Sequence, residues 1–150
     1  MAEKNEARIK WTAEQIKQGS RPEGRPFWEG TKEHKFLLPL GLDSRPFWYP
    51  RAYAPGTLED VTWKESKGEG TVYSYSVHYI GPNGSFKGDP PHVVALVDLD
   101  EGVRVMTNLV KDEENFPSIG PDDVQIGQRV RVVYEVLSED VTLPRFTPAD

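Results

Sequence analysis

The sequence predicts a mainly β protein built around a five-stranded barrel of the OB type. Four segments are rich in β-branched and aromatic residues or alternate apolar with polar residues, as strands do: 71–80, 92–99, 103–109 and 129–137. The turn at 100–102 ends in Gly102, which can take the positive φ angle of a tight hairpin. A short closing strand at 143–146 completes a meander, which favours a closed barrel over a sheet with exposed edges.

The first third of the chain has a different texture and predicts a helical appendage. The apolar residues over 5–18 have the spacing of an amphipathic helix, which Gly19 and Ser20 end. The segment 21–30 holds two prolines and two glycines, so we expect turns that lead into a short helical piece at its end. This region is predicted to flank the core rather than to form it.

Composition describes a water-soluble chain of ordinary size. Its 150 residues suit one domain with an appendage. The 24 acidic and 18 basic residues give a net charge of -6, and no apolar run approaches the ~20 residues of a membrane span. Residues 1–10 are charged and lack the apolar stretch of a secretory signal, so we expect a cytoplasmic protein.

Three tyrosines on the strand at 71–80 raise the question of nucleic-acid binding. Simple alternation places Tyr73, Tyr75 and Tyr79 on one face, where they would form either a stacking platform for bases or part of the barrel core. A pI of about 5.1 opposes the binding of phosphate backbones. Nucleic-acid binding is therefore the less favoured interpretation.

The chain offers few groups for catalysis or metal binding. It contains no cysteine, which excludes disulfides, thiolate nucleophiles and cysteine-ligated zinc. His34, His78 and His92 are too far apart in sequence to form a local metal motif, and we interpret them as structural rather than as general bases. The acidic segment 98–101 is interpreted as a solvated turn. We assign no catalytic residue.

Five motifs occur in an order that resembles a known family across nearly the whole chain. They are PFWEG at 26–30, YPR at 49–51, GEGTVYSYS at 68–76, PHVVALVDLDEG at 91–102 and IGQRV at 126–130. The family comprises acyl-CoA-associated proteins with a rubredoxin-like zinc ribbon followed by an OB fold, known as domain of unknown function thirty-five. The resemblance implies three parts: an N-terminal helical appendage at 1–35, a ribbon at 36–63 and an OB-fold domain at 64–150.

The sequence departs from this family at the positions of the zinc ligands. Alignment on the YPR motif places the family's four zinc-binding cysteines at Leu40, Asp43, Ala54 and Thr57. Leucine and alanine carry no ligand atom, so the resemblance implies a degenerate ribbon without its zinc. Either a partner holds this segment, or it packs on itself through large apolar side chains: Leu40, Leu42, Phe47, Trp48, Tyr49 and Tyr53.

The resemblance also implies a function. Members of this family accompany thiolase-like enzymes (thiolases, aldolases or acyltransferases) that act on acyl-CoA. We therefore expect a non-catalytic accessory subunit in a hetero-oligomer, with no cofactor bound by this chain alone and a coenzyme A thioester shared with the partner. A stand-alone acyl-CoA-binding module and an independent enzyme are the alternatives.

Two sets of residues are candidates for these contacts. The first consists of aromatic residues in the appendage or in loops, which are predicted to anchor a partner unless they fold back on the barrel: Trp11, Phe27, Trp28, Phe86 and Phe116. Trp28 and Phe86 are the favoured anchors, and the loops 81–91 and 111–123 are the expected contact surfaces. The second set comprises basic residues for the phosphates of coenzyme A: Lys64, Lys67, Lys87, Arg104 and Arg129.

Overall fold

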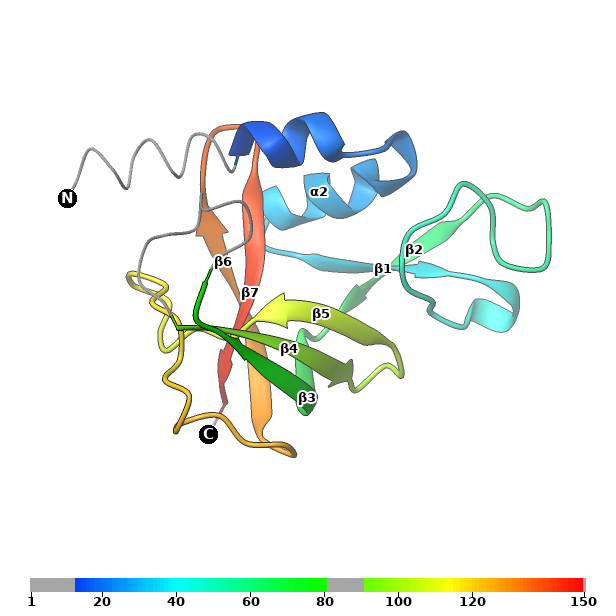
Figure 1. Ribbon diagram of the computed structural model, residues 1–150. Coiled ribbons are helices and arrows are strands. Elements are labelled where there is room, and N and C mark those ends of the chain that lie inside the picture. The colour runs from blue at the N-terminus through cyan, green and yellow to red at the C-terminus, as the bar shows by residue number, and fades with distance from the viewer. Residues whose placement is uncertain (1–12, 81–90, 150) are drawn as a thin grey trace.

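A computed structural model describes residues 13–80 and 91–149. Helical residues 13–19 precede a short 3-10 turn, η1 (Pro22–Gly24), and the helix α2 (Arg25–Lys32). The strands β1 (Phe36–Leu40) and β2 (Thr62–Ser66) then form an antiparallel pair. The segment 41–61 between them, which contains η2 (Leu42–Ser44), projects away from the rest of the molecule (Figure 1).

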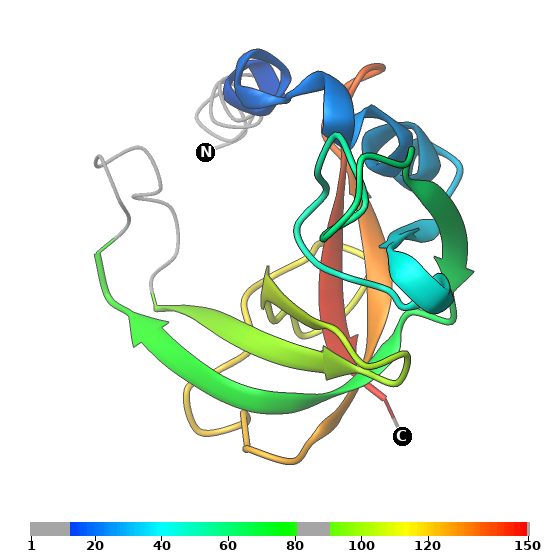
Figure 2. The same cartoon turned by 90° about the vertical axis from the view of Figure 1, so that its right-hand side faces the viewer.

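The remaining strands form one curled antiparallel sheet in the order β5-β4-β3-β6-β7. They are β3 (Glu69–His78), β4 (His92–Leu99), β5 (Arg104–Asn108), β6 (Arg129–Val136) and β7 (Thr142–Pro148). A parallel bridge between Leu109 and Phe146 joins the two edge strands, and the backbone N–H of Val110 donates to the carbonyl of Phe146 at 2.8 Å. The sheet thus curls into a nearly closed barrel (Figure 2), which confirms the predicted OB-type fold.

The core of the barrel comes from the alternation of β4 and its neighbours. Val93, Ala95, Val97 and Leu99 are all buried on one face of β4, while the residues between them are only partly buried. Apolar side chains from the other strands meet them inside the barrel. The predicted short strand at 143–146 is longer than expected, because β7 pairs with β6 along its whole length.

A β-bulge in β3 overturns the predicted arrangement of the tyrosines. The register shifts between Val72 and Ser74, so that Tyr73 is the extra residue. After the shift, Tyr75 pairs with the buried Ala95 and lies on the same face of the sheet, where it remains 37% exposed. Tyr73 instead lies under the guanidinium of Arg104 on the outer face. The three tyrosines therefore do not form one platform, because one inserted residue reverses the face of every residue that follows.

Gly70 should tolerate no side chain. A Cβ at this position would lie 2.5 Å from the carbonyl oxygen of Asp98 and 2.8 Å from Cγ1 of Val97. We expect Gly70→Ala to lower the free energy of unfolding by about 1–3 kcal/mol, because β3 and β4 must separate to admit the methyl group. Urea denaturation measures the change. The matched control is Gly19→Ala, which meets nothing within 4 Å and should leave stability unchanged or raise it.

Candidate functional site

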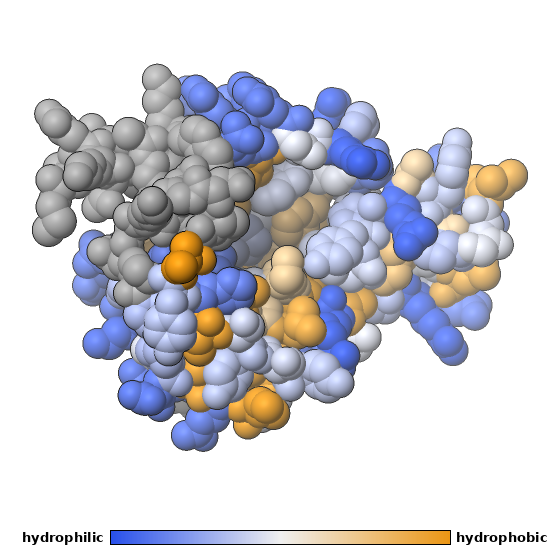
Figure 3. All heavy atoms as spheres, viewed as in Figure 1, coloured by the Kyte–Doolittle hydropathy of each residue, from blue (hydrophilic) through white to orange (hydrophobic). Residues whose placement is uncertain are grey.

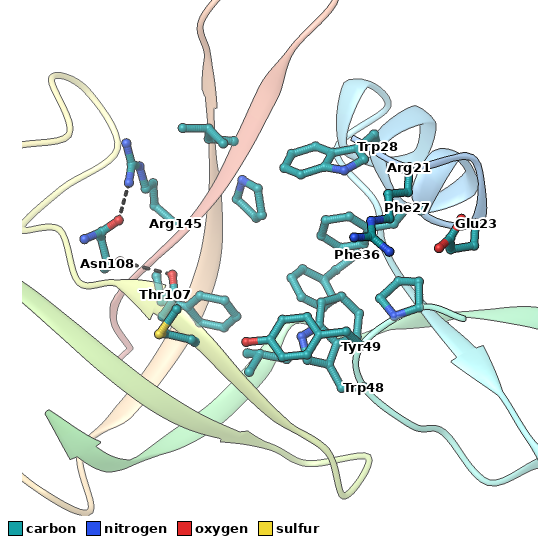
Figure 4. A pocket seen from close by; sticks show the side chains of 17 residues that line it. Arg21, Glu23, Phe27, Trp28, Phe36, Trp48, Tyr49, Thr107, Asn108 and Arg145 are labelled. Carbon is teal, nitrogen blue, oxygen red and sulfur yellow. Dashed lines mark hydrogen bonds between the residues drawn. The ribbon is translucent and has the colours of Figure 1, made fainter. Parts of the chain in front are cut away.

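An aromatic cavity of about 360 Å³ opens between the N-terminal helices and the barrel. One wall comes from η1, α2, β1 and residues 48–50, and the facing wall comes from β5 and β7 (Figure 4). Five aromatic side chains build the first wall: Phe27, Trp28, Phe36, Trp48 and Tyr49. The backbone places them together because α2 and the base of the 41–61 segment both pack against β1 and the barrel.

These rings form a connected cluster, and the contacts of the central Phe27 ring are edge-to-face. The ring of Phe27 lies 5.2 Å from those of Trp28 and Phe36 and 5.1 Å from that of Trp48. Phe36 in turn contacts Phe146 of β7 at 6.0 Å. Phe27 is only 6% exposed, so it folds back into the core and is not available to a partner in this conformation. Trp28 packs against the same core but also lines the cavity.

Two arginines line this cavity in different electrostatic settings. Arg145 donates to Oε2 of Glu135 at 3.0 Å and to Oδ1 of Asn108, so its charge is matched inside the fold. Arg21 lies at the mouth, and its guanidinium makes no ion pair with any of the described carboxylates. The cavity therefore combines an aromatic lining with a single unmatched cation at its entrance.

Ion pairs occupy the outer face of the barrel. Arg104 donates to both oxygens of Asp98 at 2.7 and 3.1 Å, and Arg129 donates to both oxygens of Asp100 at 2.8 Å. The guanidinium of Arg104 also lies 3.3 Å from the centre of the Tyr73 ring. These arginines hold the pKa values of Asp98 and Asp100 below the usual range. The acids in segment 98–101 are therefore structural partners, not a solvated turn as expected.

The basic candidates for coenzyme A phosphates do not form one cluster. Lys64 is exposed on β2, and Lys67 lies in the connection between β2 and β3. Lys67 is close enough to Asp100, the partner of Arg129, to help lower the pKa of that carboxyl. Arg104 and Arg129 are already paired, which leaves Lys64 and Lys67 as the unpaired exposed lysines of this set. Lys87 lies outside the described residues.

Glu101 stabilises the connection between β2 and β3 through hydrogen bonds. Its carboxylate accepts from the hydroxyl of Ser66 at 2.8 Å and from the backbone N–H of Lys67 at 2.9 Å. The Ser66 hydroxyl oxygen also accepts from the N–H of Gly68. Gly68 has a φ angle of 70°, and this bend carries the chain from the ribbon into the barrel. Sequence reasoning missed this role because residues 66 and 101 are far apart along the chain.

The histidines have separate surroundings. The ring of His34 stacks on Tyr134 at 4.9 Å, and burial together with Glu65 raises the pKa of Tyr134 well above its usual range. Nε2 of His78 lies 3.1 Å from the hydroxyl of its strand neighbour Ser76 on an exposed surface. Within the described ranges, no group of three histidine, aspartate or glutamate side chains could hold a metal ion.

The four ribbon positions do not offer a zinc site. Leu40 ends β1 and Ala54 is buried, and neither side chain has a ligand atom. The hydroxyl of Thr57 donates to the carbonyl of Ala54. Asp43 lies in η2 with a φ angle of 55°. The donor set does not fit a tetrahedral zinc, although the alignment with the family's cysteines stays a prediction.

The expected self-packed cluster of the 41–61 segment forms only in part. Trp48 joins the core through Phe36, at 5.7 Å between ring centres. Leu42, Tyr49 and Tyr53 instead remain more than half exposed. The segment is therefore anchored at its base, and its tip presents apolar side chains to solvent.

The other aromatic candidates are only partly placed. Phe116 is half-buried in the loop 111–123, with a φ angle of 51°. Trp11 and Phe86 lie outside the described residues, so their roles stay predictions. In the described part of the chain, none of the helices is long and apolar enough to cross a bilayer.

The paired carboxylates should make stability depend on pH. Each has a lower pKa in the folded chain, so it stabilises the fold above its unfolded pKa of about 3.9 and loses that effect as the pH falls through its folded pKa. The urea midpoint of the wild type should therefore drop between about pH 6 and about pH 3, and this drop should be smaller in the double variant Asp98→Asn/Asp100→Asn. The difference between the two proteins should be larger at low salt. The control Asp122→Asn should show the same drop in urea midpoint as the wild type.

Comparison with known proteins places this fold in a family. A family model described as "ChsH2, C-terminal OB-fold domain" matches residues 63–135. The chain is 36% identical over 117 residues to a "DUF35 domain-containing scaffold protein" of Methanocaldococcus jannaschii, covering 75% of this chain and 77% of that protein. It is 42% identical over 126 residues to a "Probable enoyl-CoA hydratase alpha subunit" of Thermomonospora curvata.

That second alignment covers 82% of this chain but only 37% of the hydratase subunit, so the chain spans little more than a third of that relative. A solved structure named "Ltp2-ChsH2(DUF35) aldolase" is similar with a TM-score of 0.73 and 30% identity, covering 88% of this chain and 98% of that one. The match covers about three quarters of the scaffold protein and nearly the whole of the solved DUF35 chain. The chain therefore belongs to the DUF35 family of OB-fold proteins.

Proposed function

We propose that this chain is a non-catalytic accessory subunit that docks on a thiolase-like enzyme acting on acyl-CoA. The observation that carries the proposal is the similarity to the DUF35 chain of the "Ltp2-ChsH2(DUF35) aldolase", whose name joins that chain to a second component. The scaffold name of the Methanocaldococcus jannaschii relative supports the same role. The proposal includes a hetero-oligomer in the cytoplasm, where the sequence predicts the protein to be.

The outer surface of β3, β4 and β5 is the docking face in this proposal. Ser74, Leu96 and Met106 pair with one another in one row across these strands. Met106 is 62% exposed, and Tyr73 beside this row is 50% exposed. Figure 3 shows apolar side chains gathered in this region of the surface. Exposed apolar side chains of this size are typical of protein interfaces.

A polar border adjoins this docking face. The Asp98–Arg104 pair lies in the neighbouring row of the same three strands, and Arg129 follows beside Thr71. An apolar centre with a charged rim is the usual anatomy of a specific interface. Because the arginines are held by carboxylates, they present their charges in fixed positions rather than as mobile side chains, which favours a defined orientation of the partner.

Coenzyme A enters this proposal as a ligand shared with the partner. Of the described cations, Lys64 and Lys67 are exposed and have no carboxylate in ion-pair distance among the described residues. We assign them, with Lys87, to the phosphates of the thioester. Arg104 and Arg129 are assigned to the polar border of the docking face instead, because their guanidinium groups already donate to Asp98 and Asp100.

Substitution of Met106 should disrupt the complex without disrupting the fold. We expect tagged Met106→Glu to recover at least about tenfold less thiolase-like enzyme than the wild type from the native host, because a carboxylate would be desolvated in the interface. Mass spectrometry identifies and quantifies the partner. The matched control is Val136→Glu on β6, since Val136 is 63% exposed and lies outside the docking face.

Two measurements on the isolated chain discriminate the alternatives. Calorimetry with acyl-CoA should show much weaker binding to the chain alone than to the complex, whereas equal binding would favour a stand-alone acyl-CoA-binding module. Turnover of acyl-CoA thioesters by the purified chain, or recovery of no thiolase-like enzyme with the wild type, would contradict the accessory role.

A further inference from the structure

We propose that the aromatic cavity binds a small amphiphilic monocarboxylate. Its apolar body would lie against Trp28, Trp48 and Tyr49, and its carboxylate would meet the guanidinium of Arg21. The site lies between the helices and the barrel. Met106 of the docking face also lines it, so the two adjoin, but the cavity is complete within one chain. It therefore does not rest on the accessory role proposed above.

The size and lining of the cavity fit an apolar ligand. Its volume of about 360 Å³ lies within the usual range of small-molecule sites, ~300–1,000 Å³. Phe36 and Phe146, at 3% and 1% exposure, form its deep end. Tyr49 is 57% exposed at the mouth. A bound apolar group would remove this exposed aromatic surface from water, which is favourable.

Arg21 gives the site its preference for an anion. Figure 4 shows its side chain over the aromatic wall, between Trp28 and Tyr49 in that view. Arg145 belongs to the opposite wall, and its guanidinium is already satisfied by Glu135 and Asn108. Arg21 is thus the cavity's guanidinium without a described ion-pair partner, and its planar fork of donors matches a carboxylate.

Glu23 limits the charge that the mouth accepts. It also lines the cavity, and in Figure 4 Arg21 lies between it and β5. Its carboxylate would repel a second negative group on the ligand. This arrangement favours one carboxylate next to Arg21 over a dicarboxylate or a highly charged phosphate ester.

A neighbouring cavity provides an internal contrast. It has a volume of about 280 Å³ and lies between helical residues 13–19 and the turn near Asp140, with charged groups along its lining. The Lys17–Asp140 ion pair, at 2.7 Å, connects the two sides. Arg21 and Trp28 line both cavities, whereas Arg25 lines only the second, so Arg25 serves as a control for a nearby cation outside the aromatic cavity.

The test uses the full chain with three probes: octanoate, 1-octanol and acetate. We expect octanoate to bind in calorimetry and to change the tryptophan fluorescence, because Trp28 and Trp48 line the cavity. Octanol, which has the same chain length without the charge, should bind about tenfold more weakly. Acetate, which lacks the apolar body, should show no measurable binding.

Four variants separate the charge from the cavity. Arg21→Gln should weaken octanoate binding about tenfold and leave octanol binding unchanged, whereas Arg25→Gln should alter neither. Glu23→Gln should leave octanoate binding equal or stronger. Thr107→Phe, on the β5 wall, should abolish binding of both octanoate and octanol by filling the cavity. Circular dichroism and urea midpoints establish that each variant is folded.

Three results would overturn the proposal. The wild-type chain could fail to bind octanoate at all. The variants Arg21→Gln and Arg25→Gln could reduce octanoate binding equally, which would indicate a general effect of surface charge. A folded Thr107→Phe chain could bind both probes as the wild type does, which would place binding outside the aromatic cavity.

Discussion

Phe146 makes the backbone contacts that close the barrel, and the rest of the structure depends on this closure. Its carbonyl accepts from Val110, and its bridge to Leu109 joins the two edge strands that would otherwise expose unpaired backbone groups. Its ring is 1% exposed and contacts Phe36. One residue therefore connects the hydrogen bonds that close the barrel to the aromatic cluster. The helices and the ribbon pack against the barrel through this cluster.

The aromatic cluster explains how the ribbon is anchored. Phe27, Phe36 and Trp48 bring together α2, β1 and the base of the 41–61 segment. Phe27 and Phe36 are buried and contribute about 1.5–3 kcal/mol each, whereas Trp48 is only partly buried. Apolar packing fixes the base of this segment. The tip keeps Leu58 at 87% exposure, so the anchoring does not extend along the whole segment.

The two surfaces proposed for recognition differ in character. The outer face of β3, β4 and β5 combines Met106 and Tyr73 with the Asp98–Arg104 pair, which suits contact with another protein. The aromatic cavity is concave and has one unmatched cation, Arg21, which suits a small anion with an apolar body. The two surfaces adjoin at Met106, which lines the cavity and belongs to the outer face of β5.

Local patterns in the sequence determined the strands, and tertiary contacts determined the site. The alternation at 92–99 predicts β4 correctly, because the period of a strand is encoded by adjacent residues. The bulge at Tyr73 and the pairs of Arg104 and Arg129 with their aspartates could not be predicted this way, since they depend on register with other strands. The cavity likewise required α2, β1, β5 and β7 to meet. Side chains from segments far apart in sequence become neighbours only when the barrel closes, so their contacts leave no periodic signal in the chain.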